Sequence, residues 1–221
     1  MNYLKNTMFI SSFYQYRRFA LLLVCAALLA SCDRLLSPNF ESDIQEVSAG
    51  QFTLDPDHAT LIFKINHLGF STYIGRFNTL DASLDFDPEN IENSSLEVIV
   101  DVTSLDINNA EFAQELLGSA WFDAENFPQA VFRTTRFVEA NENSFTFEGD
   151  LTLKGTTAPV TLNANFHGAG INFLTRRNTV GFSGSANFKR SEFGMERFTS
   201  FGVGDDIELE IHVEFQEAAA E

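Results

Sequence analysis

The chain of 221 residues contains only two cysteines, Cys25 and Cys32, and both lie near its N-terminus. The long remainder therefore has no thiol for a disulfide, a thiolate metal ligand or a cysteine nucleophile. Basic residues are also few, because 14 lysines and arginines stand against 31 acidic residues, which gives a formal net charge of -17. Nucleic acid binding needs a basic surface, so this balance argues against nucleic acid as a partner.

Sequence motifs for metal binding and catalysis are missing. None of the four histidines has a second histidine two or four positions away, a compact spacing that favours metal binding. The chain has no G-x-S-x-G elbow, and no spacing singles out two of its many carboxylates as a catalytic pair. We therefore expect no metal, no cofactor and no enzymatic activity.

An apolar run extends from Phe19 to Ala30 and follows the basic residues Lys5, Arg17 and Arg18. It is too short to span a bilayer, which takes about 20 residues. Its length and its basic flank are typical of the apolar region of a secretory signal peptide. The run leads into the tetrapeptide Leu29-Ala30-Ser31-Cys32.

This tetrapeptide resembles the lipobox of bacterial lipoproteins. The resemblance implies that residues 1–31 are a lipoprotein signal peptide and that Cys32 becomes the lipidated first residue. The acyl chain would then hold the protein at a membrane, on the periplasmic side of the bacterial cell envelope. An ordinary secretory signal and an uncleaved anchor are the alternatives. Residues 32–50 are polar and show no clear period, which predicts a flexible tether.

Residues 51–216 carry the period-2 alternation of strands that bury one face, and residues 217–221 form a tail. The alternation is clearest from Phe145 to Leu153 and from Ile207 to Phe215. About eight such segments, with Pro or Gly at most turns, predict one all-β domain, either a sandwich or a barrel. The chain has 24 phenylalanines, which must be hidden in a core or around an apolar ligand.

The segment from Phe52 to Phe86 begins this domain. Asp55-Pro56-Asp57-His58 predicts a turn, and the alternation that follows places His67 on the inward face. A second run changes parity at Asn78-Thr79, which predicts a β-bulge within one long bent strand. A small closed barrel needs such a strand.

One good helix signal occurs in the domain. Asn108 is a plausible N-cap, with Glu111 completing a capping-box pattern. Ile107 and Phe112 have the spacing of a hydrophobic staple, and Gly118 ends the pattern. The sequence therefore predicts a short helix that closes one end of the barrel.

Three groups of residues stand out in this domain. They are Asp55-Pro56-x-His58 with Phe63-x-Ile65-x-His67-Leu68, Gly75-x-Phe77 and Phe86-Asp87-Pro88; Gly149 to Val160; and Arg190 to Gly194. Together these groups resemble the YceI family. The resemblance implies an all-β, lipocalin-like antiparallel eight-stranded β-barrel, with one short helix capping an end, that binds polyisoprenoid lipids. Two places depart from the family pattern: Phe52 stands where the family has Trp, and Ala113-Gln114-Glu115-Leu116-Leu117 stands where it has Arg-Asp-x-His-Leu.

Inward parity selects the residues expected to line a tunnel for an isoprenoid or similar long apolar lipid, of the quinone or polyprenyl type. His67 is either a hydrogen-bonded core histidine or a contact to the lipid head, and Arg190 either closes the barrel end or contacts the head. The expected ligand-binding residues are Phe63, Ile65, His67, Phe77, Leu84, Val98, Val100, Phe132, Leu151, Phe182, Phe188 and Arg190.

Other functions remain open at this point. The barrel interior could be filled by its own side chains, and the acidic surface could then dock a basic partner in a salt-sensitive way. An enzyme acting on a lipid headgroup would lose turnover when His67 is changed. A homodimer is a further alternative, and the sequence does not name the lipid or the membrane.

Overall fold

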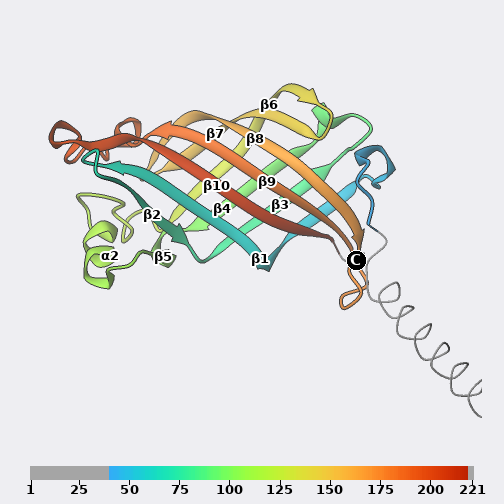
Figure 1. Cartoon of the computed structure of the whole chain (residues 1–221), viewed down its shortest axis with the longest axis horizontal. Coiled ribbons are helices and arrows are strands. Elements are labelled where there is room, and N and C mark those ends of the chain that lie inside the picture. The colour runs from blue at the N-terminus through green and yellow to red at the C-terminus, as the bar shows by residue number, and fades with distance from the viewer. Residues whose placement is uncertain (1–39, 219–221) are drawn as a thin grey trace, which may run out of the picture. The chain divides into compact units, whose positions relative to one another are not determined.

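The computed structural model describes residues 40–218, which form one closed antiparallel β-barrel (Figure 1). Eight strands close the barrel in the order β10-β9-β8-β7-β6-β4-β3-β1, because β1 also pairs with β10. Two short strands, β2 and β5, continue the sheet beyond β1. The strands are β1 Gly50–His67, β2 Ser71–Phe77, β3 Leu80–Phe86, β4 Ser95–Asp101, β5 Leu105–Asp106, β6 Gln129–Asn141, β7 Ser144–Leu153, β8 Thr156–Ile171, β9 Asn178–Lys189 and β10 Val203–Glu217.

Strand β1 passes straight through the segment that the sequence predicted as a turn, so that prediction is wrong. Leu54 lies opposite Phe215 of β10, while Ala59 lies opposite Val213, so the residues between them form a bulge. Pro56 has no N–H for the ladder. The N–H of Asp57 donates to Asp55 Oδ1 at 3.1 Å, a local bond that replaces strand pairing.

Strands β2 and β3 lie along the same edge of β1 and are interrupted at Asn78-Thr79, where the sequence predicted the slip. Leu61 of β1 pairs with Phe77, and Gly50 pairs with Phe86. The interrupting residues turn their N–H groups to Ser104, whose carbonyl and hydroxyl accept at 3.2 and 2.9 Å. The predicted single bent strand is therefore two strands, because Ser104 takes bonds that a continuous ladder would use.

The predicted helix is α2, Ala110–Leu117, and it lies at one end of the barrel beside β2 and β5 (Figure 1). Its N-cap is Asn109 rather than Asn108: the Asn109 side chain accepts from the N–H of Phe112 at 3.0 Å. Gly118 ends the helix as predicted. Within residues 40–218, no helix is both long enough and apolar enough to cross a membrane. Five short 3-10 helices complete the structure: η1 Ile44–Glu46, η2 Ile91–Asn93, η3 Val102–Ser104, η4 Arg190–Phe193 and η5 Thr199–Phe201.

The second half of the predicted tether is part of the folded unit. Ile44 is buried in the same apolar cluster as Phe52, and Glu41 exchanges two backbone hydrogen bonds of 2.8 Å with Ala169 of β8. Burying the apolar side chain of Ile44 is favourable, which explains why this otherwise polar segment packs against the barrel. The predicted signal peptide, the lipidation site Cys32 and the first part of the tether lie outside the described residues.

The connections between β7, β8 and β9 follow local sequence with one exception. Lys154 and Gly155 both have positive φ, 51° and 75°, as a two-residue type I′ hairpin requires. Strand β8 then runs on through Gly168 to Ile171, although glycine is depleted in strands. His167 is an exposed residue of β8.

Candidate functional site

The barrel interior contains two cavities that share a boundary. One has a volume of about 170 Å³ and is enclosed almost entirely by strands, and we call it the apolar chamber. The other has a volume of about 350 Å³ and includes residues of α2, and we call it the helix-side chamber. The side chains of Leu61, Val100, Leu151 and Leu209 line both cavities. The two cavities therefore adjoin at these four residues.

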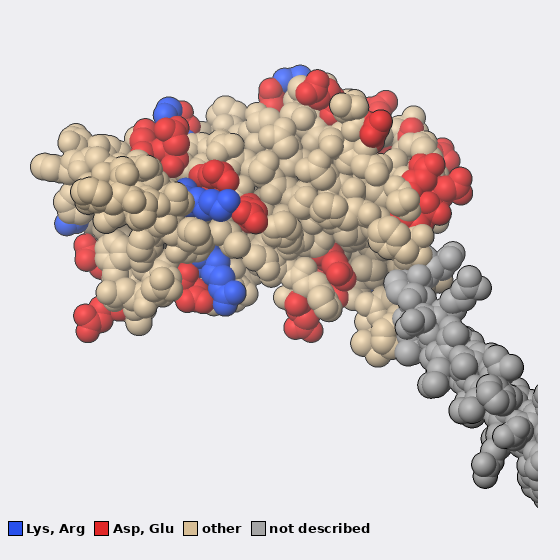
Figure 2. All heavy atoms as spheres, viewed as in Figure 1, with Lys and Arg blue, Asp and Glu red and all other residues tan. Residues whose placement is uncertain are grey.

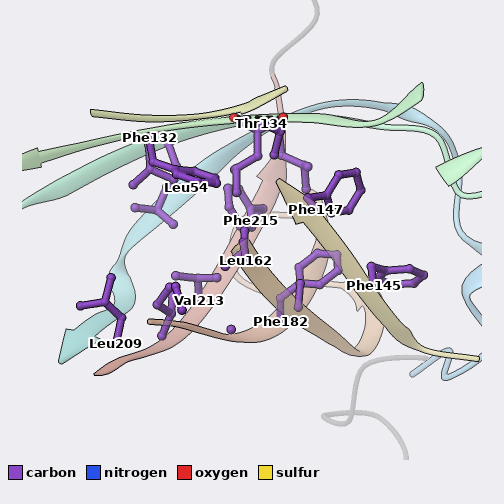
Figure 3. A pocket seen from close by; sticks show the side chains of 18 of the residues that line it. Leu54, Phe132, Thr134, Phe145, Phe147, Leu162, Phe182, Leu209, Val213 and Phe215 are labelled. Carbon is purple, nitrogen blue, oxygen red and sulfur yellow. Dashed lines mark hydrogen bonds between the residues drawn. The ribbon is translucent and has the colours of Figure 1, made fainter. Parts of the chain in front are cut away.

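The apolar chamber is lined mainly by hydrocarbon side chains that alternate along the strands (Figure 3). The Phe182 ring is central, with its centroid 5.5 Å from that of Phe166 and 5.7 Å from that of Phe86. Thr134 offers a hydroxyl, but this oxygen already accepts from the N–H of Leu96 at 2.9 Å. The chamber therefore suits hydrocarbon.

The helix-side chamber carries polar groups among its aromatic walls. Trp121, Arg190, His67 and Tyr73 all line it. Edge-to-face contacts order the walls, such as Phe77 with the loop residue Phe122, whose centroids lie 5.7 Å apart. An apolar cavity with a few polar groups is typical of a ligand site.

The structure brings every predicted ligand-binding residue to one of the two chambers. Most come from alternate positions of the strands, as their inward parity predicted. Leu84, Val98, Phe132 and Phe182 line the apolar chamber; Phe63, Ile65, His67, Phe77, Phe188 and Arg190 line the helix-side chamber; and Val100 and Leu151 line both.

Arg190 is the most buried charged residue of the described chain, with 3 % of its surface exposed. Its guanidinium donates to the carbonyls of Gly204 at 2.7 Å, Arg197 at 2.9 Å, Val203 at 3.3 Å and Met195. Four of its five N–H groups are thereby used. Of the two alternatives for this residue, closing the barrel end by backbone bonds accounts for these contacts.

The surroundings of Arg190 are consistent with that role. Burial lowers the pKa of the Arg190 guanidinium from its ordinary value, and the nearby charge of Asp205 opposes this shift. Asp205 itself accepts from the backbone N–H of Ser191 at 3.0 Å and from its hydroxyl at 2.8 Å. These bonds hold η4 against the start of β10.

His67 is exposed at the end of β1, so the interpretation as a buried core histidine is wrong. Its ring centroid lies 6.3 Å from that of Tyr73, and both residues line the helix-side chamber. The inward parity was correct, but the barrel wall ends at this level. His67 therefore stands at the rim of the helix-side chamber.

Sequence reasoning missed Trp121, which lies in the loop after α2 and is 9 % exposed. Its Nε1 atom is buried and has no hydrogen-bond partner among residues 40–218. The Phe198 ring centroid lies 6.0 Å from that of Trp121, and the Arg190 guanidinium carbon lies 5.8 Å from it. Leu116, within the segment that departs from the family pattern, also lines this chamber.

An exposed apolar rim lies at the helix-side end of the barrel. It consists of Leu68 and Phe70, after β1, and Phe198 and Phe201, before β10, which are between 42 and 86 % exposed. The N–H of Leu68 donates to the carbonyl of Gly202 at 3.0 Å and ties the two segments together. Figure 2 shows an area without charged side chains at the tip of this end, with a few acidic and basic groups beside it.

Among the described residues, one group of potential metal ligands lies together, on the outside of the barrel at the β1 bulge. Asp55, His58 and Glu214 have ligand atoms within 4.8 Å of one another. His58 Nδ1 and Asp55 Oδ2 are already hydrogen-bonded at 3.0 Å, and Gln216 Nε2 donates to the same oxygen at 2.6 Å. These bonds account for the cluster as a structural pair that stabilises the bulge.

A closed antiparallel barrel that encloses apolar cavities and is capped by a short helix defines the lipocalin-like class of folds. Within this class the chain belongs to the YceI family, because the YceI-like domain matches residues 52–215. A UPF0312 protein of Vibrio cholerae is 36% identical over 169 residues, which cover 76% of this chain and 87% of that relative.

Solved structures have the same architecture. The crystal structure of BcnA from Burkholderia cenocepacia has a TM-score of 0.66 and 26% identity, and the match covers 73% of this chain and 98% of that one. A polyisoprenoid binding domain from Saccharophagus degradans has a TM-score of 0.54 over 77% of this chain and 100% of that one. It is only 11% identical, so this second likeness concerns the fold alone.

Proposed function

We propose that this protein binds an isoprenoid or similarly long apolar lipid, of the quinone or polyprenyl type, inside its barrel without catalysis. The observation that carries the proposal is the pair of adjoining, mainly apolar chambers inside the barrel. A structural neighbour from Saccharophagus degradans is described as a polyisoprenoid binding domain. That description and the shared fold support the same ligand class for this chain.

The apolar lining of the two chambers favours a long hydrocarbon. Each CH₂ group removed from water contributes about 0.8 kcal/mol, so one five-carbon isoprene unit contributes about 4 kcal/mol before ordering costs. A dry cavity of about 150 Å³ is known to accept benzene. The helix-side chamber, at about 350 Å³, is more than twice that size. Several isoprene units buried in the two chambers would therefore bind tightly.

The alternative of an acidic interaction module requires a packed interior. The two cavities count against it, since side chains that filled the barrel would leave no such volumes. The alternative still makes a distinct prediction, which is binding of a basic protein that weakens as salt is raised.

The cellular placement is part of the proposal: the protein is anchored by an acyl chain on Cys32, on the periplasmic side of the cell envelope. Growth with a labelled fatty acid tests this. The wild-type chain and Cys25→Ser should both incorporate label, whereas Cys32→Ser should not. Labelling that survives Cys32→Ser would reject the anchor while leaving lipid binding intact.

Native mass spectrometry tests the bound lipid. The folded part of the chain, from Phe40 onward, is produced without the predicted signal peptide and Cys32 and purified without detergent, and its lipids are extracted and identified. We expect a bound species of isoprenoid character. A protein that carries no lipid, and that takes up neither added quinone nor added polyprenol, would overturn the proposal.

A further inference from the structure

We infer that the connection between β8 and β9, residues 172–177, is a membrane contact that sets the orientation of the barrel. The apolar side chains of this β8–β9 loop enter the headgroup region of a lipid bilayer, and the helix-side end faces away from that membrane. This inference rests on the proposed acyl anchor at Cys32 and goes beyond it. An acyl anchor limits how far the barrel lies from a membrane but does not orient it.

The first argument is the apolar character of the loop. Phe173 is 54 % exposed and Leu174 is 76 % exposed. Ile171, the last residue of β8, is 52 % exposed beside them. A turn on the surface of an acidic protein needs no such side chains, and exposed apolar patches mark sites of membrane or protein contact.

The second argument is that the loop is held in shape by its own hydrogen bonds. Asn172 Oδ1 accepts from the N–H of Leu174 at 2.9 Å, and the N–H of Arg176 donates to the Asn172 carbonyl at 2.8 Å. Arg177 Nε donates to the carbonyl of Glu217 at 2.6 Å, which ties the loop to the end of β10. The apolar side chains are therefore displayed by a folded turn, and inserting them into a bilayer costs little ordering entropy.

The third argument concerns charge. The only charged residues of the loop are Arg176 and Arg177, in a chain with a net charge of -17. Arg176 is exposed, and a guanidinium beside apolar side chains can donate to lipid phosphates while its stem lies along apolar surface. Of the acidic side chains at this end, Glu41 accepts from a backbone N–H at 2.8 Å and Glu217 from Asn178 Nδ2 at 2.6 Å. The loop itself therefore presents apolar and basic groups, as a phospholipid surface requires.

The fourth argument is that the loop lies where the chain enters the folded unit. Glu41 exchanges two backbone hydrogen bonds of 2.8 Å with Ala169, two residues before the end of β8. The ring of Phe40 packs over Gly168 and leaves no room for a Cβ there. Figure 1 shows the loop extending from this end of the barrel, opposite to α2. An anchor placed ahead of Phe40 therefore brings this end toward its membrane.

The length of chain available separates the two ends of the barrel as membrane contacts. The residues from Cys32 to Phe40 reach at most about 29 Å when fully extended. Phe215 lies at the level of Ala169 through pairing with β9, and β10 from Val203 to Phe215 covers about 30 Å along the axis of a barrel with tilted strands. A barrel standing on its apolar rim would need the connection fully stretched, whereas a barrel standing on the β8–β9 loop needs almost none of it.

The test attaches the folded unit to a bilayer chemically. The chain from Cys32 onward has this cysteine as its single thiol, which is coupled to a maleimide lipid in phosphatidylcholine vesicles. Phe173→Trp places a reporter in the loop, and Phe201→Trp, in the apolar rim, is the matched control. Lipids brominated along their acyl chains quench tryptophans that enter the bilayer, and Trp121, present in every sample, gives the background. We expect at least half of the fluorescence added by Phe173→Trp to be quenched, and none of that added by Phe201→Trp.

Further substitutions, each combined with Phe173→Trp, separate insertion from mere proximity. Leu174→Asn removes the most exposed apolar side chain of the loop, so it should lower the ratio of docked to undocked barrels about tenfold. Arg176→Gln removes the charge and should lower the same ratio about threefold. Thr175→Ser, a conservative change in the same turn, should leave it unchanged.

Each contrary outcome overturns the inference in a different way. Quenching at position 201 instead of 173 would show that the opposite end meets the bilayer, and quenching at neither would show that the barrel stands off the membrane. Quenching at 173 that Leu174→Asn leaves unchanged would mean proximity without insertion. A tryptophan at 173 that is shielded before vesicles are added, in a protein that sediments as a dimer, would assign the loop to a second copy of the chain.

Chemical coupling keeps these outcomes independent of the proposed function. Acylation of Cys32 in cells is tested by the fatty-acid labelling, and the lipid inside the barrel by mass spectrometry. Loss of either proposal would leave the quenching result as it is, and absence of quenching would leave both proposals intact.

Discussion

The two chambers lie in one barrel, yet they differ in how they are built. The apolar chamber is lined by strand residues at alternate positions, such as Phe145 and Phe147 of β7, and by the short η2 segment. The helix-side chamber adds Leu116 of α2, Trp121 from a loop and Phe198 before η5. Regular alternation therefore produces the apolar chamber, whereas the segments that interrupt the alternation add Trp121 and Arg190 to the helix-side chamber, beside the strand residues His67 and Tyr73. We expect the apolar chamber to provide binding affinity and the helix-side chamber to provide selectivity between ligands.

Removing Arg190, which lies at the helix-side end of the barrel, should have the largest effect on stability. Arg190→Met deletes donors to four backbone carbonyls and should lower the free energy of unfolding by about 3 kcal/mol. The neighbouring Lys189→Met deletes an ion pair with Asp206, which contributes little to stability because both side chains are exposed. Urea denaturation measures both. Equal losses in the two variants would contradict the structural role of Arg190.

The contrast between chambers also separates what the sequence could predict from what it could not. Side chains on a strand point alternately to its two faces, so parity alone assigned Phe132, Leu151 and Phe182 to the interior, and the structure places them there. Trp121 lies in a loop, where no period fixes the direction of a side chain. Only the coordinates show that its N–H is buried and unpaired.

The errors in the fold have a related cause. Asp55-Pro56-Asp57-His58 has the composition of a turn, but pairing of β1 with β10 on both sides keeps the chain extended through it. Ile44 is a single apolar residue in a polar segment, and its burial depends on contacts with distant strands. Contacts between residues that are distant in the sequence determine both features, and local sequence patterns do not indicate such contacts.

A smaller effect should follow from filling the apolar chamber. Gly184 lines it, and a Cβ added there would meet Leu162 at 3.4 Å and Ile211 at 3.5 Å, which are ordinary contacts. Gly184→Leu should therefore fold, and its outer carbons should displace part of a bound tail. We expect a loss of about 2 kcal/mol, roughly thirtyfold in Kd, for long-tailed quinones, measured by equilibrium extraction.

The same measurement on a short-tailed quinone sharpens the comparison. Its ring would occupy the helix-side chamber, so Gly184→Leu should leave its Kd within twofold. Gly181→Leu is the matched control on β9, because it has outward parity and an added Cβ there meets only the Gly168 carbonyl at 3.8 Å. Equal weakening of short and long tails by Gly184→Leu, or any comparable loss in Gly181→Leu, would mean that the chambers do not divide the ligand as proposed.

The smallest expected effect is a pH dependence of stability. It comes from the β1 bulge, which follows Leu54 in the wall of the apolar chamber. The hydrogen bond with Asp55 raises the pKa of His58, and the charge of Glu214 adds to this. Burial acts to raise the pKa of Asp55, but its hydrogen bonds with His58, Asp57 and Gln216 outweigh burial and lower it.

The direction of the pH dependence follows from these two shifts. A raised pKa in the folded state means that His58 stabilises the fold below its unfolded pKa of about 6.5 and loses this contribution as the pH rises through the folded value. Asp55 stabilises the fold above about pH 3.9, and its contribution is lost as the pH falls through its lowered folded value. His58 is largely exposed, so its contribution should stay below about 1 kcal/mol.

Unfolding experiments at pH 6 and pH 8 check this. The wild-type protein should lose more stability across that interval than His58→Gln, whereas His167→Gln, which removes an exposed histidine of β8, should keep the wild-type difference. Quinone binding should be unchanged in His58→Gln, because the bulge lies outside the lined cavity. A pH dependence of quinone binding that disappears with His58→Gln would show instead that the bulge influences the apolar chamber. The apolar chamber would then contribute more than hydrocarbon contacts to binding.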